Sequence, residues 1–131
     1  MQTTLFRKSA VLIDQNPLQC KLYEDVLNAN GFDVYVAKST MDGLVKIKEK
    51  KQDITVINTE IAEENYIKRF VSKIKTEDVS QEMPILGVSI YSKECKKNIA
   101  HILDDFLTKP LSIDKFMESV FCSIEKKLDG C

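Results

Sequence analysis

The stretch SAVLIDQNP, residues 9–17, contains the pattern that decides the fold. It begins as a short apolar run, which is typical of a strand buried on both faces of a sheet. Asn16 and Pro17 then predict the start of a helix, because asparagine is a favoured N-cap and proline fits the first helical position. Asn30 and Gly31 predict its end, since glycine readily adopts the left-handed conformation that closes a helix.

The same alternation of strand and helix continues along the whole chain. Short runs rich in apolar and β-branched residues predict further strands, at 33–37, 53–57, 84–88 and 105–108. Apolar residues at helical spacing predict helices, at 17–29, 40–50, 66–75, 93–102 and 112–128. In the first of these helices the spaced residues are Leu18, Leu22, Val26 and Ala29. Strict alternation with short connections predicts a doubly wound α/β fold, a parallel sheet with helices on both faces.

Composition restricts the class of protein. The 131 residues suit one domain, which we place at 8–128 with short tails at 1–7 and 129–131. Hydrophobic residues make up 44% and charged residues 30%, enough for a core and a polar surface. The net charge of −1 provides no overall attraction to nucleic acid or to an anionic membrane. We therefore expect neither as a partner.

Targeting and metal signals are absent from the sequence pattern. No apolar run approaches the roughly 20 residues that span a bilayer, and the N-terminus is too polar for a secretory signal. The four cysteines have no metal-binding spacing, and His101 is the only histidine. We expect reduced thiols in a cytoplasmic protein, with neither a zinc site nor a disulfide framework.

Polar residues follow the predicted strands at the edge where chemistry is expected. In a doubly wound sheet, ligands bind beside the carboxyl ends of the strands. The residues at those ends are Asp14, Gln15, Asn58, Ser89 and Lys109.

Three segments carry a resemblance to a known family. VLIDQNP at 11–17, DITVIN at 53–58 and FLTKP at 106–110 together resemble the CheY-like receiver domain of bacterial response regulators. The resemblance covers about residues 8–126, and it is most similar to the stand-alone receivers of alphaproteobacterial cell-cycle pathways. It implies a flavodoxin-like sheet of five parallel strands in the order 2-1-3-4-5.

The family assigns a role to each of these strand ends. In a working receiver, two acidic residues after the first strand and an aspartate after the third hold Mg²⁺. That aspartate accepts the phosphoryl group, which a lysine and a serine or threonine then bind. Asp14, Ser89 and Lys109 match this pattern, and the peptide bond between Lys109 and Pro110 matches one that is usually cis in the family.

Two matched positions have lost their chemistry. Gln15 stands where the main Mg²⁺ carboxylate belongs, and Asn58 stands where the phosphoacceptor belongs. An amide is uncharged and a poor nucleophile, so we expect a degenerate phosphorylation site, with no catalytic residue, no metal and no cofactor. The loop also departs from the family, with Ala62 and Tyr66 where proline and glycine are common. Glu60 could supply a carboxylate near the site, although a solvated acidic loop is the favoured interpretation.

Two further residues have alternative interpretations. Lys109 either recognises phosphate or forms a structural ion pair with Asp14, beside the carbonyl of Asn58, and the second interpretation is favoured. Phe106 matches the family's aromatic switch position. Because phenylalanine has no hydroxyl to hold it at the surface, we expect its ring to point permanently inward, either as a fixed switch or simply as a core residue.

The favoured function is that of a pseudo-receiver, which binds protein without phosphorylation. Its partner would be a histidine kinase, another response regulator or an adaptor, bound at the face of the fourth helix, fifth strand and fifth helix. A homodimer is also possible there. The charged residues expected on this face are Lys93, Lys96, Lys97, His101, Asp104, Asp105, Lys115 and Glu118.

Two other functions remain open. The domain could be a phosphorelay receiver that uses a non-standard acceptor, either Glu60 or Asp14. It could also be a sensor whose polar pocket of Gln15, Asn58, Ser89 and Lys109 binds a small anion or a nucleotide.

Overall fold

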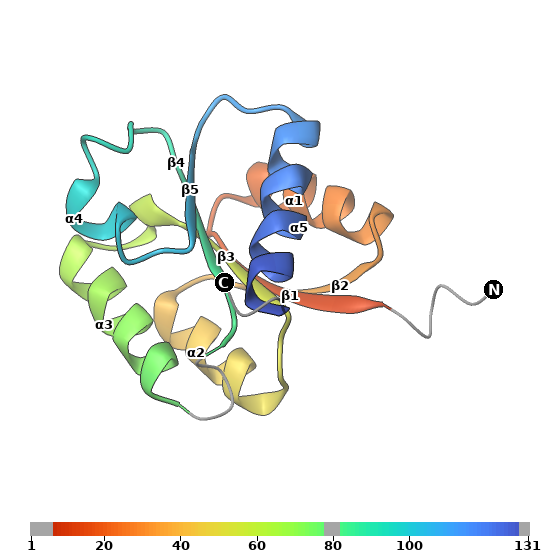
Figure 1. Ribbon diagram of the computed structural model, residues 1–131, viewed down its shortest axis with the longest axis horizontal. Coiled ribbons are helices and arrows are strands. Elements are labelled where there is room, and N and C mark those ends of the chain that lie inside the picture. Colours follow the sequence, from red (N-terminus) through yellow and green to blue (C-terminus); the bar gives the residue numbers. More distant parts are fainter. Residues whose placement is uncertain (1–6, 78–81, 129–131) are drawn as a thin grey trace.

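A parallel sheet forms the centre of the molecule. The structure is a computed structural model that describes residues 7–77 and 82–128. The five strands lie in the order β2-β1-β3-β4-β5 (Figure 1). Their bounds are β1 Lys8–Ile13, β2 Phe32–Ala37, β3 Ile54–Asn58, β4 Ile85–Ser89 and β5 Asp105–Thr108. All pairs are parallel, which confirms the predicted doubly wound fold and its strand order.

Helices cover both faces of the sheet (Figure 1). Their bounds are α1 Pro17–Ala29, α2 Thr40–Glu49, α3 Glu64–Thr76, α4 Lys97–Ala100 and α5 Ile113–Leu128, with a single 3₁₀ turn, η2, at Thr59–Ile61. Residues of α1 and α5 pack on one face, and residues of α2, α3 and α4 pack on the other. Within the described residues, no helix combines the length and apolar character needed to cross a bilayer.

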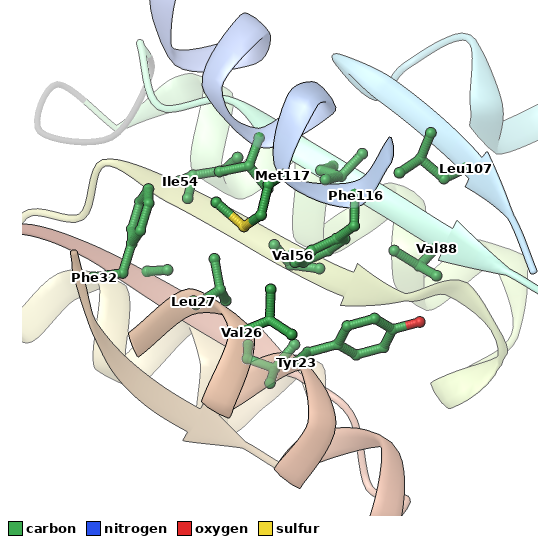
Figure 2. Close-up of a cluster of buried hydrophobic side chains, with 14 of the residues drawn as sticks. Tyr23, Val26, Leu27, Phe32, Ile54, Val56, Val88, Leu107, Phe116 and Met117 are labelled. Atoms are coloured by element: carbon green, nitrogen blue, oxygen red, sulfur yellow. The ribbon is translucent and has the colours of Figure 1, made fainter. Parts of the chain in front are cut away.

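The two cores result from the alternation of side chains along each buried strand. Leu12 and Val56 point toward α1 and α5, where the rings of Tyr23 and Phe116 lie 4.8 Å apart (Figure 2). Ile13 and the residues paired with it on the two adjacent strands point to the opposite face, toward α2 and α3. Because both faces are buried, the strands contain the continuous apolar runs that identified them in the sequence.

The predicted signals at the ends of α1 are confirmed. The side-chain oxygen of Asn16 accepts hydrogen bonds from the backbone N–H groups of Leu18, at 3.0 Å, and Gln19, at 3.1 Å. Pro17 occupies the first helical turn. Gly31 follows the helix with a φ of 92°, in the left-handed region that favours glycine.

The apolar row predicted for α1 is partly wrong in its orientation. Val26 is buried as expected, but Leu18 is 83% exposed and Leu22 is 50% exposed, whereas the other buried residues of the helix are Cys20, Tyr23 and Leu27. Both sets of residues have helical spacing, and only the packing of α1 on the sheet selects between them.

The fourth helix is shorter than the predicted span of 93–102. Residues 93–96 form turns, and the backbone N–H of Cys95 donates to the Ser92 hydroxyl at 3.2 Å. This polar segment has few apolar residues to bury, so only the turn containing Ile99 and Ala100 packs on the core. The connection between the predicted helix at 66–75 and the predicted strand at 84–88 lies partly outside the described residues, as do the predicted tails. Arg7, expected in a tail, instead donates to Asp33 at 2.8 Å.

Candidate functional site

The carboxyl ends of β1 and β3 bring Asp14 and Asn58 together. Asp14 is only 1% exposed, and its Oδ1 atom accepts hydrogen bonds from the Asn16 backbone N–H at 2.9 Å and from Asn58 Nδ2 at 3.2 Å. Two uncharged donors therefore stabilise this buried carboxylate. The side chain of Gln15 lies exposed beside them.

Lys109 does not form the ion pair with Asp14 that we predicted. Its ammonium group donates instead to the side-chain oxygen of Gln19, and no ion pair joins it to Asp14 in the part of the chain that the structure describes. The first turn of α1 places Gln19 at this edge of the sheet, whereas Asp14 already accepts a hydrogen bond from the Asn58 amide. The peptide bond between Lys109 and Pro110 is cis, as the resemblance implied.

Sequence reasoning missed Gln19 as a site residue. Its position three residues after the N-cap Asn16 was the available signal, because the first turn of a helix after a strand lies beside that strand's carboxyl end.

Glu60 is anchored by three hydrogen bonds and one ion pair, so the interpretation of a solvated acidic loop is wrong. Its Oε2 atom accepts from the hydroxyls of Thr59 and Ser89, each at 2.6 Å. Its Oε1 atom accepts from the backbone N–H of Ile90 at 3.0 Å, and Lys96 Nζ forms an ion pair at 3.7 Å from Oε2. We call Glu60 and these four partners the Glu60 clamp.

The η2 turn determines the direction of the Glu60 side chain. The side-chain oxygen of Asn58 accepts from the Glu60 backbone N–H at 3.0 Å and thereby caps this turn. Glu60 consequently points toward the end of β4 and the loop after it. The Asn58 amide therefore donates from its nitrogen to Asp14 and accepts with its oxygen from the backbone of the η2 turn.

The clamp favours the ionised form of Glu60. Burial alone would raise the pKa of its carboxyl group. Hydrogen bonds from Ser89, Thr59 and Ile90, together with the Lys96 ammonium, outweigh burial and lower the pKa below its ordinary value. The carboxylate therefore remains negatively charged at neutral pH.

The aromatic switch position is filled by a buried ring. Phe106 is 6% exposed and belongs to the core on the side of α2 and α3. Gly87 on β4 lies against this ring and against Thr59, because a Cβ atom there would lie 2.5 Å from Leu103 Cδ1, 3.2 Å from Thr59 Cγ2 and 3.4 Å from Phe106 Cδ2. Phe106 is thus packed near Thr59, a member of the Glu60 clamp.

The residues present do not fit the Mg²⁺ site of the family. That ion requires several oxygen ligands, and carboxylates are its main protein ligands. Asp14 is the one carboxylate at the matched positions, and two N–H groups already occupy its Oδ1 atom. Among residues 7–77 and 82–128, no three histidine, cysteine, aspartate or glutamate side chains form a cluster that could hold a metal.

Comparisons with known proteins identify the family of this domain. The model of the response regulator receiver domain matches residues 10–121. The chain is 22% identical over 116 residues to the polar-differentiation response regulator DivK of Brucella anthropi, covering 86% of this chain and 93% of that protein. DivK of Brucella ovis shows the same identity and coverage.

Solved structures show the same fold. A CheY-like receiver domain protein from Methanospirillum hungatei is 16% identical, with a TM-score of 0.81, and the match covers 95% of this chain and 99% of that one. A receiver domain of a sensor histidine kinase from Pseudomonas aeruginosa, solved with magnesium in its active-site cleft, is 14% identical, with a TM-score of 0.80 and coverage of 91% and 98%. Receiver domains act in two-component signalling, where they interact with kinases and other regulators. This chain belongs to the response regulator receiver domain family.

Proposed function

We propose that this receiver domain is a pseudo-receiver, a signalling regulator that binds a protein partner without being phosphorylated. The Glu60 clamp is the observation that supports this most. In the family, the hydroxyl at the position of Ser89 binds the phosphoryl group. Here that hydroxyl already donates to a carboxylate of the same chain, at 2.6 Å.

The loss of the acceptor supports the same proposal. Asn58 has no nucleophilic oxygen, and both ends of its amide are hydrogen-bonded within the site. Glu60 itself is a poor alternative phosphoryl acceptor, because three hydrogen bonds and the Lys96 ion pair hold its carboxylate at the end of β4. An anion entering the site as a ligand would meet the charge of Glu60, which disfavours the small-anion sensor as well.

The partner surface that we propose is the face of α4, β5 and α5. A cavity of about 330 Å³ lies on this face between the end of β5 and the start of α5. Its lining includes Leu107, Thr108, Leu111 and Lys115. The Thr108 hydroxyl donates to the backbone carbonyl of Tyr91 at 3.1 Å, which connects this face to the loop that carries the Glu60 clamp.

The exposed charges of this face are of both signs. Asp104 accepts from the Ile85 backbone N–H at 2.7 Å, and Asp105 accepts from the Ser119 hydroxyl. Both aspartates are therefore used within the fold. The side chains that remain exposed are Lys93, Lys97, His101 and Lys115, together with Glu94, Asp114 and Glu118. A histidine kinase, regulator or adaptor with charges of both signs on its surface would complement them.

Phosphorylation by acetyl phosphate with Mg²⁺, read by intact mass, tests the proposal. We expect no phosphoryl adduct on the natural chain. A variant with Gln15→Asp, Asn58→Asp and Glu60→Ala should gain an adduct, because it regains the acceptor and metal ligands and releases Ser89. The double variant that retains Glu60 should gain less. An adduct on the natural chain would contradict the proposal.

A further inference from the structure

A groove between α2 and α3 lies outside the receiver site. These helices lie side by side on one face of the sheet (Figure 1). The α2–α3 groove has a volume of about 330 Å³. Its floor includes Phe70, which is 1% exposed, and its walls include Met41, Val45 and Tyr66.

The apolar walls of the groove are uncovered. Met41 is 72% exposed, Val45 is 48% exposed and Tyr66 is 54% exposed. Ile47, on the opposite side of α2, supplies the core contact of that helix. Met41 and Val45 therefore contribute little to the fold, and a contiguous apolar surface of this kind is typical of an interaction site.

Three cations accompany this apolar surface. Lys48, Arg69 and Lys73 line the same groove. Lys48 lies 3.8 Å from Glu77, but both side chains are about half exposed. The ion pair therefore contributes little to the stability of the fold, and Lys48 can pair with a carboxylate of a partner instead. Arg69 lies over the ring of Tyr66, with its guanidinium carbon 5.7 Å from the ring centroid.

The groove has a direction. Met41 and Tyr66 lie near the N-terminal ends of α2 and α3, whereas Lys48 and Lys73 lie near the C-terminal ends. Both helices connect parallel strands of one sheet, so they run in the same direction. Met41 to Lys48 spans about 10 Å, or about two helical turns. The groove therefore offers an apolar half followed by a basic half.

We propose that the α2–α3 groove binds an amphipathic helix of a protein partner, with acidic residues in its first turn and an apolar row after them. The bound helix runs antiparallel to α2 and α3. Its acidic first turn then lies over Lys48 and Lys73, and its apolar row lies on Met41, Val45 and Tyr66. Carboxylates in the first turn also stabilise such a helix, because its N-terminus carries positive partial charge.

A synthetic peptide provides a direct test. The probe is a fluorescein-labelled peptide of about 14 residues, with glutamates in its first turn and leucines three and four residues apart. We expect saturable binding by fluorescence anisotropy, with a Kd of about 100 μM or tighter. Amide chemical-shift changes in the labelled protein should concentrate on α2 and α3.

Matched variants locate the binding. Arg69→Glu with Lys73→Glu should weaken binding about tenfold, as should Met41→Asp. Lys21→Glu with Lys126→Glu changes the net charge equally at exposed positions on α1 and α5, away from the groove, and should leave binding unchanged. Thermal unfolding checks that all variants fold, and the altered side chains are exposed.

Three outcomes would overturn the proposal. The first is no saturable binding up to about 1 mM peptide. The second is equal weakening by the groove and control charge reversals. The third is a monomer–dimer equilibrium in sedimentation that Met41→Asp abolishes, which would assign the groove to a second copy of the chain.

Discussion

The Ser89 hydroxyl donates a hydrogen bond of 2.6 Å to the Glu60 carboxylate and so joins the end of β4 to the η2 turn. Ser89 is fully buried. Its oxygen in turn accepts from the Tyr91 backbone N–H at 2.9 Å. The hydroxyl is thus held on both sides, and the loop after β4 is held with it.

Glu60→Gln should lower the free energy of unfolding by about 1–2 kcal/mol, because an amide oxygen is a weaker acceptor than a carboxylate and Lys96 loses its charge partner. Urea denaturation measures the difference. Glu63→Gln is the control, since Glu63 is exposed and its side chain makes no capping hydrogen bond to α3. Equal stability of the Glu60 variant and the natural chain would show that the clamp contributes nothing to the fold.

The stabilisation by Glu60 should depend on pH. The clamp lowers the pKa of Glu60 in the folded chain below the ordinary value of 4.5. Its contribution is therefore complete above about pH 4.5 and is lost as the pH falls through the folded-state pKa. The stability difference between the natural chain and Glu60→Gln should shrink over this acidic range. A difference that stays constant on acidification would contradict the lowered pKa.

Asn58→Asp alone should destabilise the fold by about 2 kcal/mol in the absence of a divalent cation. The new carboxylate would face Asp14 Oδ1, which now accepts from Asn58 Nδ2 at 3.2 Å. Thermal unfolding with and without MgCl₂ measures the effect, and Mg²⁺ should restore part of the loss. Asn98→Asp, on the exposed surface of α4, should change neither stability nor its response to Mg²⁺.

A double-mutant cycle should separate the observed partner of Lys109 from the expected one. Gln19→Ala and Lys109→Met should be coupled by about 1 kcal/mol, because their side chains are hydrogen-bonded. Asp14→Asn and Lys109→Met should be additive within about 0.5 kcal/mol. Strong coupling in the second cycle would instead support the ion pair between Asp14 and Lys109 that the sequence suggested.

Gly87→Ala should lower the free energy of unfolding by about 1–3 kcal/mol. The added Cβ would lie 2.5 Å from Leu103 Cδ1 and 3.2 Å from Thr59 Cγ2, so core side chains must move. Chemical denaturation measures the loss. An unchanged stability would mean that Leu103 and Thr59 can move aside without cost, and would contradict tight packing around Gly87.

Local signals in the sequence were sufficient for the order and type of the elements. Asn16, Pro17 and Gly31 act within one or two turns of their own positions, and buried strands must be apolar wherever they lie. The same reasoning placed Asp14 and Asn58 at one edge of the sheet, where the structure joins them.

The side-chain partners could not be predicted in this way. Gln19 and Lys109 are 90 positions apart, and only the assembled sheet decides whether Gln19 or Asp14 receives the ammonium group. The direction of Glu60 depends on the η2 turn that Asn58 caps, which no periodic pattern encodes. The exposed face of α1 was misassigned because Leu18 and Leu22 have the same helical spacing as the residues that are buried.

The Glu60 clamp also has an evolutionary consequence. A change of Asn58 to aspartate would restore the acceptor but leave Ser89 held by Glu60, while the loss of Glu60 alone would remove a stabilising contact without restoring any chemistry. Each single step back toward a phosphorylatable receiver therefore carries a cost and gives no immediate benefit. If the domain is a pseudo-receiver as proposed, the clamp therefore disfavours its reversion by single substitutions.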